Sequence, residues 1–194
     1  MTRTYTLKRR AEQQAETRLR LVEAAVELHS RIGPAGTTLT MVAARAGVQR
    51  HTLYAHFPDE RSLQLACSQL ALERSPLPDA APWTAIADPA ERLRHGLTQL
   101  YRWYADNADL AGCVLRDAES HPLTREIIDL RITPSMTAYH DVLGQGLTTR
   151  QRAVLHLALQ YASWRALVRD GGLKPAGAVE VMVQAIAASC AARS

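Results

Sequence analysis

The stretch TTLTMVAARAGVQRHTLYAHF, residues 37–57, holds two short helical patterns on either side of a glycine. Thr38 stands where an N-cap is expected, and apolar residues follow it at the spacing of one helix face: Leu39, Val42, Ala43 and Ala46. Gly47 ends this pattern, because glycine readily takes the left-handed conformation that closes a helix. A second helical pattern follows after a link of about three residues, which predicts a steeply crossed pair, a helix-turn-helix.

The second helix of this pair has little to bury. At about 100° per residue, Leu53 and Phe57 form one narrow apolar edge, while His51, Thr52 and Ala55 point to the opposite side. This pattern predicts an outer face that contacts a partner.

Helical spacing of apolar residues continues on both sides of the pair, so we predict an all-α fold. A first helix is expected over 16–32, and another begins after Asp59, which can serve as its N-cap. Three prolines in residues 75–83 exclude a regular helix there and place a domain boundary nearby. We therefore predict three parts: a basic N-terminal arm over 1–15, a helix-turn-helix domain over 16–74 and a second helical domain over 75–194.

The second domain contains two clear helix starts. A capping box at Asp88 opens a helix to about residue 105, and another at Thr148 opens a helix that we expect to reach Arg169. Between them we predict helices over 108–119 and 123–143, the latter kinked or broken by Pro134.

The last two helices are predicted to form an antiparallel hairpin, with Gly171 and Gly172 in the link and a final helix from Pro175 to about residue 192. The first is apolar on most sides, and the second is rich in small residues that allow close helix approach. We expect them to pair with a second copy in a four-helix bundle, with an ordinary monomeric core as the alternative. The candidate dimer contacts are Leu155, Leu159, Ala162, Ala178, Met182, Ala185 and Ser189.

Composition narrows the class of protein. An apolar content of 47% excludes a disordered chain, and neither a membrane-spanning apolar run nor a signal peptide is evident, so we expect a soluble cytoplasmic protein. Six basic and two acidic side chains give residues 1–20 a net charge of +4, which equals the charge of the whole chain. A basic segment that includes Lys8, Arg9 and Arg10 suits contact with a polyanion.

The sequence contains no signature of metal binding or catalysis. Cys67, Cys113 and Cys190 are isolated, which suits a reducing compartment without disulfides, and the seven histidines are dispersed. Motifs of hydrolases, nucleotide-binding enzymes and zinc enzymes are missing, so we expect no cofactor, no metal and no enzymatic activity.

The pattern TTLTMVAARAGVQRHTLYAHFPDERSL over residues 37–63 resembles the DNA-binding signature of the TetR family of bacterial transcription regulators. The matching positions are Thr37-Thr38, Val42-Ala43, Ala46-Gly47-Val48, Thr52-Leu53-Tyr54, His56-Phe57-Pro58 and Leu63. From about residue 76 onward, the chain resembles the family only in length and helical layout.

The resemblance implies that helix 49–56 enters the major groove of DNA and that helix 38–46 lies across the groove entrance. By helical angle, His51, Thr52 and Ala55 then face the bases, whereas Arg50, Tyr54 and His56 lie where phosphates run. Arg50 either pairs with guanine O6 and N7 or binds a phosphate. The candidate DNA contacts are Thr38, Thr40, Gln49, Arg50, His51, Thr52, Tyr54, His56 and Arg61, with Lys8, Arg9 and Arg10 on the arm. As alternatives, Tyr54 and His56 pack on the first helix, and Thr52 is a buried hydroxyl.

Two positions depart from the family pattern. His51 stands where relatives often have a small residue or proline, so the operator sequence cannot be transferred from them. Glu60 stands where many relatives have a phosphate-binding lysine, so either Arg61 replaces that contact or the contact is missing. We expect the basic arm to compensate by following the DNA backbone or entering the minor groove.

The resemblance also implies that the second domain dimerises the protein and encloses a small-molecule effector. The candidate ligand residues are Trp103, Tyr104, Cys113, Arg116, Met136, Tyr139, His140, Tyr161, Trp164 and Arg165, although aromatic residues at helical spacing are more often core. An inward Arg116 or Arg165 would favour an anionic ligand. Cys113 is either a redox sensor activated by Arg116 or a small buried hydrophobe.

These observations favour a dimeric transcription regulator, most simply a repressor, that binds a double-stranded DNA operator and responds to a small molecule. One alternative is an architectural DNA-binding protein without an effector, which a ligand-dependent change in DNA affinity would exclude. A second alternative is an enzyme or ligand carrier that uses the helix-turn-helix only for packing.

Overall fold

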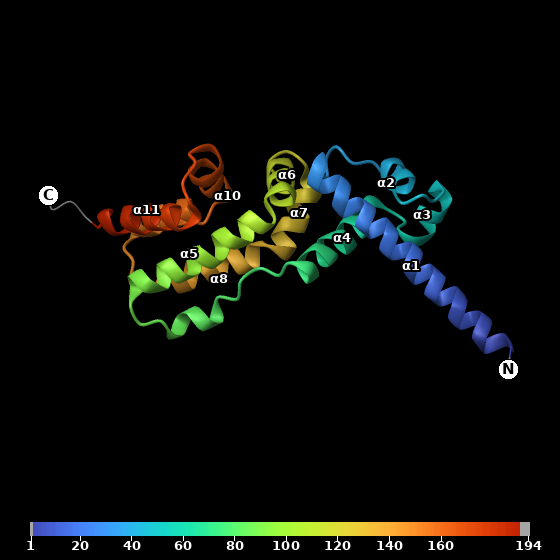
Figure 1. The fold of residues 1–194 in the computed structure, drawn as a ribbon, viewed down its shortest axis with the longest axis horizontal. Coiled ribbons are helices and arrows are strands. Elements are labelled where there is room, and N and C mark those ends of the chain that lie inside the picture. The colour runs from blue at the N-terminus through green and yellow to red at the C-terminus, as the bar shows by residue number, and fades with distance from the viewer. Residues whose placement is uncertain (1, 191–194) are drawn as a thin grey trace. The chain divides into compact units, whose positions relative to one another are not determined.

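The computed structural model describes the backbone of residues 2–190 and the side chains of residues 8–190, and this part of the chain contains helices and no strand (Figure 1). The all-α fold predicted from the sequence is therefore confirmed. The chain divides into two compact units. The first unit runs to Arg74 and also includes Gly112–Ile128, and the second unit comprises Ser75–Ala111 and the chain from Asp129 onward.

The first unit is built on four helices: α1 (Thr2–Arg31), α2 (Leu39–Arg45), α3 (Arg50–His56) and α4 (Glu60–Arg74). Parts of α6 (Ala108–Ala118) and α7 (Pro122–Arg131) complete it. The core lies between α1, α2, α3 and α4, and its fully buried side chains include Leu21, Val42, Leu53, Phe57 and Leu63. Residues 112–128, which the sequence analysis assigned to the second domain, pack with this unit.

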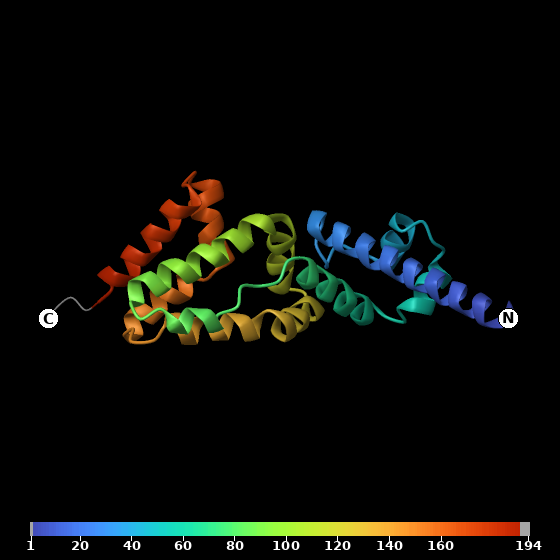
Figure 2. The same cartoon turned by 60° about the horizontal axis from the view of Figure 1, so that its bottom comes forward.

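The predicted start of the first helix at residue 16 is wrong, because α1 begins at Thr2. Residues 2–15 contain no glycine or proline and are rich in helix-forming Ala, Glu, Gln, Lys and Arg, so the helix continues through them. The basic segment is thus helical rather than an extended arm. Its first turns project beyond the other helices of the unit in Figures 1 and 2, and the side chains of residues 8–16 are exposed.

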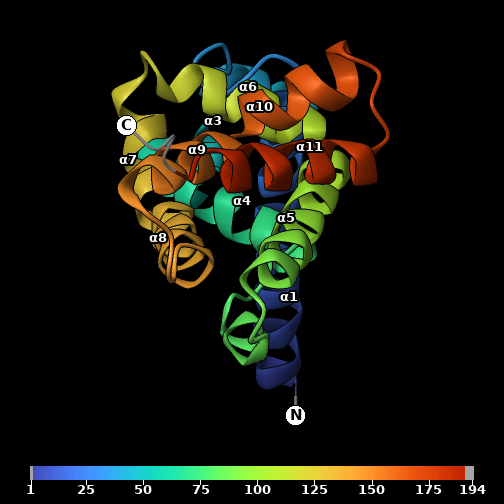
Figure 3. The ribbon, with the colours of Figure 1, turned by 90° about the vertical axis from the view of Figure 1, so that its left-hand side faces the viewer.

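The second unit contains a short 3₁₀ segment η1 (Ala81–Ala85), α5 (Pro89–Asp106), α8 (Thr133–Leu143), α9 (Thr149–Ala158), α10 (Tyr161–Trp164), a π-helical segment η2 (Arg165–Asp170) and α11 (Pro175–Ala188). α11 packs against α5 and α9 (Figure 3), and α8 runs beside α5 (Figure 2). Leu97, Leu100, Leu155, Trp83 and Trp164 are among the side chains buried between them.

Several predicted helix signals of this unit are confirmed. Asp88 caps α5 through the amides of Ala90 and Glu91, and Thr148 forms a reciprocal capping box with Gln151. The break expected near Pro134 separates α7 from α8. The predicted end of the last helix near residue 192 is wrong, because α11 ends at Ala188 with Ser189 as its C-cap.

The single helix predicted from residue 148 to Arg169 is wrong, because the chain breaks after α9 at Leu159 and Gln160. The hydroxyls of Tyr101 and Tyr104 donate to the carbonyls of Ala158 and Leu159 at 3.0 and 2.7 Å. These two carbonyls would otherwise accept bonds from the following helical turn, so distant tyrosines stabilise the interruption.

Candidate nucleic-acid interface

The turn between α2 and α3 has the geometry that the sequence predicts. Thr38 is the N-cap of α2, and its hydroxyl accepts a hydrogen bond from the Met41 amide at 3.2 Å. At the other end Gly47 adopts a φ of 68°, while the Val48 amide donates to Ala43 O and the Gly47 amide to Ala44 O. These two bonds form a Schellman motif, in which the left-handed residue is normally glycine.

α3 has one buried edge and an exposed outer face. Leu53 and Phe57 are 1% exposed and hold the helix on the core, as predicted from their spacing. Gln49, Arg50 and His51 are exposed, and the side chain of Tyr54 is 42% exposed. The exposure of Tyr54 favours contact with a partner over the alternative in which it packs on the first helix.

Arg50 and Tyr54 form a small cluster on this outer face. The Arg50 guanidinium lies 5.9 Å from the centre of the Tyr54 ring, and its Nη2 donates to the Tyr54 hydroxyl at 3.4 Å. Thr52 and His56 are half-buried at the edges of the face, and Thr40 on α2 is exposed. Arg50, His51 and Tyr54 are thus the most exposed of the candidate DNA contacts within α3.

The start of α4 is acidic, and its arginine is already engaged. Asp59 accepts the Ser62 amide at 2.7 Å, a hydrogen bond that lowers the pKa of its carboxyl group. Glu60 accepts a bond from Gln64, and both Nε and Nη2 of Arg61 lie 2.7 Å from Glu126 Oε1 on α7. A phosphate at this helix end would have to compete with Glu126 for Arg61.

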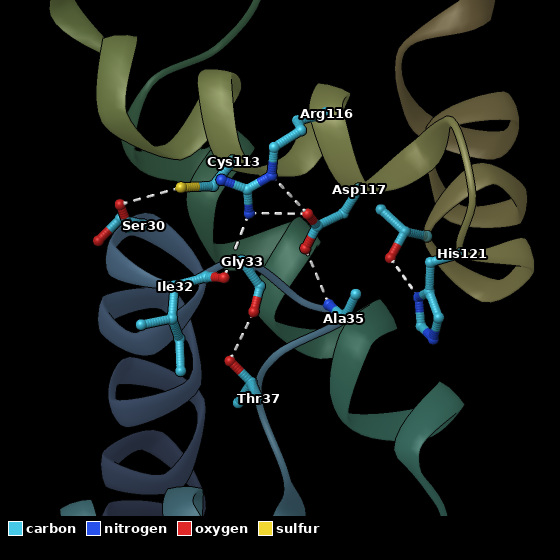
Figure 4. A network of polar contacts seen from close by, with 10 residues as sticks. Ser30, Ile32, Gly33, Ala35, Thr37, Cys113, Arg116, Asp117 and His121 are labelled. Atoms are coloured by element: carbon cyan, nitrogen blue, oxygen red, sulfur yellow. Dashed lines mark hydrogen bonds and ion pairs between the residues drawn. The ribbon is translucent and has the colours of Figure 1, made fainter.

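The structure places Cys113 and Arg116 in the first unit, against the end of α1 (Figure 4), whereas the other candidate ligand residues belong to the second unit. Cys113 Sγ donates to Ser30 O at 3.5 Å, and Arg116 Nη2 donates to Ile32 O at 3.2 Å. Arg116 also pairs with Asp117, whose carboxylate raises the pKa of the guanidinium. That these two side chains line a ligand site stays a prediction, and spacing along α6 did not reveal that they would contact the end of α1.

Most of the remaining ligand candidates belong to the core of the second unit. Their polar ends donate to backbone carbonyls: Trp103 to Ser75 O at 3.0 Å, Tyr104 to Leu159 O at 2.7 Å, Tyr139 to Pro78 O at 2.6 Å and Tyr161 to Ala108 O at 2.8 Å. Met136 is half-buried, and Arg165 is exposed and 3.7 Å from Asp170. Aromatic rings that are satisfied in this way are core residues first, which was the alternative reading of the pattern.

Trp164 differs from these aromatic residues. It is 2% exposed and lies between Tyr104 and Tyr161, with ring centres 6.0 and 5.3 Å away, yet its indole Nε1 has no hydrogen-bond partner within the described residues. The sequence predicted Trp164 as a candidate ligand residue, but it did not indicate that the indole N–H would have no hydrogen-bond partner. Helix periodicity also missed Arg92, which is 6% exposed. Among the described residues, its Nη1 and Nη2 donate to the carbonyls of Ile86 and Gln145, and its Nε has no partner.

His140 stacks on His156 of α9, with ring centres 5.1 Å apart and His140 Nε2 3.1 Å from His156 Nδ1. Burial and the neighbouring His156 lower the pKa of His140. Within the described part of the chain, no group of three or more His, Cys, Asp or Glu side chains is placed to hold a metal ion.

Four of the seven predicted dimer contacts face the core of their own protomer. Leu155, Leu159, Ala178 and Met182 are buried there, whereas Ala162 is exposed and Ala185 and Ser189 are half-buried. The same helices expose other apolar side chains, namely Leu157 on α9 and Val181 on α11. When a helix is apolar on most sides, its sequence does not tell which side meets its own core, and the predicted set was wrong in these four positions.

Comparisons with known proteins agree with this geometry. The family model described as "Bacterial regulatory proteins, tetR family" matches residues 21–67, which include the whole helix-turn-helix. A comparison with curated protein sequences finds no significant match. No helix among the described residues is both long and apolar enough to cross a membrane.

Solved structures share the fold over most of the chain. The fatty acid degradation regulator FadR from Bacillus halodurans is 17% identical, with a TM-score of 0.64 over 91% of this chain and 97% of that one. A tetR-family transcriptional regulator from Streptomyces coelicolor is 19% identical, with a TM-score of 0.59 over 90% of this chain and 80% of that one. A mutant of the HlyIIR protein is 16% identical, with a TM-score of 0.66 over 88% of this chain and 95% of that one. The family match therefore assigns the helix-turn-helix to the TetR family of bacterial regulatory proteins, and the chain as a whole shares the fold of solved regulators of this family.

Proposed function

We propose that this regulator is a cytoplasmic repressor that binds a palindromic DNA operator as a homodimer and is released by a small-molecule effector. The observation that carries the DNA-binding part is the outer face of α3. Arg50, His51 and Tyr54 are exposed there, while Leu53 and Phe57 anchor the opposite edge in the core. A helix held in this way can enter the major groove with its polar side chains toward the bases and phosphates.

The contacts divide into two kinds. His51 and Thr52 face the bases, and the Arg50–Tyr54 cluster lies on the rim, where its guanidinium and hydroxyl meet phosphates. Thr38 and Thr40 add hydroxyls at the start of α2. The exposed Lys8, Arg9 and Arg10 of α1 add sequence-independent attraction to the DNA backbone.

The exposed apolar side chains of the last helices support a homodimer. Leu157 is 54% exposed and Val181 is 43% exposed, and both lie on helices that pack on each other. A second copy with the same surface would cover them in a symmetric interface. The dimer would then present two recognition helices to half-sites about 34–36 Å apart.

Trp164 supports an effector that carries a hydrogen-bond acceptor. A buried N–H without a partner costs free energy, which a carbonyl or carboxylate of a ligand would recover. The π-helical segment η2 follows Trp164 directly, and such segments recur at functional sites. The effector acts by binding more tightly to a conformation in which the two half-sites cannot be contacted together.

The test is binding of the purified protein to fluorescent DNA that contains the inverted repeat nearest its own gene, across a salt series. We expect tight, salt-sensitive binding of one dimer per repeat, and loss of this binding in Tyr54→Ala and His51→Ala. His95→Ala, an exposed histidine of the second unit, is the matched control. Weak binding that depends neither on the DNA sequence nor on the α3 substitutions would contradict the proposal.

A compound screen on the same complex separates the proposed repressor from an effector-independent DNA-binding protein. A compound that releases the wild-type protein should fail to release Trp164→Phe, because phenylalanine keeps an aromatic side chain but lacks the indole N–H. If Trp164→Phe is released at the same concentration as the wild type, the effector does not use this donor.

A further inference from the structure

We propose that Asp117, which lies on α6 outside the helix-turn-helix, is a positioning residue for DNA binding because it fixes the turn from which α2 starts. This inference rests on the proposed function. The turn comprises residues 32–38, and the Asp117 carboxylate is 6% exposed beneath it (Figure 4).

The carboxylate holds the turn from one side. Asp117 Oδ2 accepts the Ala35 amide at 2.9 Å, and this is a contact between residues 82 positions apart. Within the turn, the Thr37 hydroxyl donates to Gly33 O at 2.8 Å and the Thr37 amide to Pro34 O at 3.1 Å. Thr37 immediately precedes Thr38, the N-cap of α2. Asp117 is therefore linked through three residues of backbone to the start of the helix that crosses the groove.

Neighbours on α6 hold the carboxylate and the end of α1 together. Arg116 Nε donates to Asp117 Oδ1 at 2.9 Å, and Arg116 Nη2 donates to Ile32 O at 3.2 Å. Cys113 Sγ reaches Ser30 O at 3.5 Å. The last carbonyls of a helix have no partner within the helix, so α6 supplies the cap that α1 lacks.

Gly33 shows how closely the turn over residues 32–38 packs against α6. Its φ is +88°, a backbone conformation that residues with a side chain rarely adopt. A Cβ at this position would lie 2.1 Å from Asp117 Oδ2 and 2.6 Å from Arg116 Nη2. Glycine is required here both by the backbone and by the carboxylate that occupies the space.

An amide cannot replace the carboxylate. Asp117 accepts on both oxygens, from Arg116 on one and from Ala35 on the other, whereas asparagine has a single acceptor oxygen. In Asp117→Asn, one of the two donors therefore faces the NH₂ group. The turn must shift, and Thr38 and Thr40 move relative to their phosphates. Hydroxyl contacts carry no charge, so the number of counterions released on DNA binding stays the same.

The experiment compares the full-length wild type, Asp117→Asn and Asp109→Asn on a DNA duplex that the wild type selects from a random library. Asp109 lies on the same helix and is 82% exposed, so its substitution removes the same charge without touching the turn. We expect Asp117→Asn to raise the Kd about tenfold, as loss of a hydrogen bond to a charged group would, with an unchanged slope of log Kd against log salt. Asp109→Asn should bind like the wild type.

Two further measurements separate positioning from loss of stability. Val22→Ala, in the core of the first unit, should lower the Tm and leave the Kd of the folded protein unchanged. Hydrogen exchange of the Ala35 amide in the free protein should be faster in Asp117→Asn than in the wild type and Val22→Ala. If Asp117→Asn does not fold, Arg116→Gln must show the same pattern with a smaller change in Kd.

The outcomes distinguish this inference from the proposed function. If the wild type selects no DNA, the proposed function fails, and Ala35 exchange still tests the contact with Asp117. If the wild type binds and Asp117→Asn, or Arg116→Gln in its place, binds equally well, the positioning role is overturned. Unchanged exchange at Ala35 in these variants overturns the geometry itself.

Discussion

His29 is the side chain of the first unit with the clearest dependence on pH. It is 5% exposed on α1, and its Nδ1 lies 3.5 Å from Cys67 Sγ of α4. Burial lowers the pKa of His29 to about 4, and the charge of Asp117 opposes this shift only in part. Burial also raises the pKa of the Cys67 thiol to about 12, so both partners are neutral near pH 7 and form an inert pair rather than a reactive centre.

We predict that this pair makes the protein acid-sensitive. The pKa of His29 is lower in the folded protein than the 6.5 of a free histidine. The free energy of unfolding is therefore highest above pH 6.5 and decreases as the pH falls toward 4, because the unfolded state then binds a proton that the folded state does not. Between pH 6.5 and pH 5 the loss is about 2 kcal/mol. Urea unfolding of the wild type and His29→Gln across this range checks the prediction. Parallel curves of unfolding free energy against pH would contradict it.

Two helix ends adjust the electrostatic attraction to DNA. The start of α4 has Asp59 and Glu60 where a phosphate contact is expected, and its Arg61 is paired with Glu126 of α7. The exposed pair contributes little to stability, so its main effect is to occupy the guanidinium. We expect the N-terminal part of α1 to act in the opposite direction, because Lys8, Arg9 and Arg10 are exposed on it.

Releasing Arg61 should strengthen DNA binding. We predict that Glu126→Gln lowers the Kd by about two- to fivefold and steepens the salt dependence by up to about one counterion. Glu73→Gln, an exposed carboxylate on the same α4, removes the same charge and is the control. Arg61→Ala should cost more affinity in the Glu126→Gln protein than in the wild type. Equal gains from Glu126→Gln and Glu73→Gln would show that only net charge matters.

Deleting residues 1–12 should weaken DNA binding and flatten its salt dependence, because Lys8, Arg9 and Arg10 no longer displace counterions. The triple substitution of these residues to glutamine keeps the length of α1 and should reproduce most of the effect. An unchanged salt slope in both proteins would mean that this part of α1 does not touch DNA.

Assembly decides whether the two recognition helices of a dimer act together. The exposed apolar side chains on α9 and α11 are the surface through which we expect a second copy to bind, and each protomer alone can contact only one half-site. We therefore expect a dimer to convert two weak contacts into one tight complex.

We predict that Leu157→Glu and Val181→Glu each yield a monomer in analytical ultracentrifugation and reduce operator affinity at least about a hundredfold. The reason is that a charge in an apolar interface loses its hydration without gaining a partner. Leu130→Glu is the control, since Leu130 on α7 is also 54% exposed but lies outside these helices. A dimer that survives both substitutions would place the interface elsewhere.

The amino-acid sequence by itself determined the parts of this protein that depend on neighbours a few positions away. The caps at Thr38, Asp88 and Thr148 and the left-handed Gly47 act through local backbone bonds, so their residue types predict them. The buried edge of α3 follows from helical periodicity. The exposed outer face of α3 can therefore be predicted from the sequence alone.

Only the tertiary structure decided features that depend on residues far apart in the sequence. The break after α9 requires tyrosine hydroxyls 57 and 55 positions away, and the cap on α1 requires Arg116 from a helix 84 positions away. Which apolar side chains of α9 and α11 stay exposed likewise follows from how the protomer's own core is filled. Local periodicity cannot encode these choices, because it describes which residues share a face and not which element covers that face.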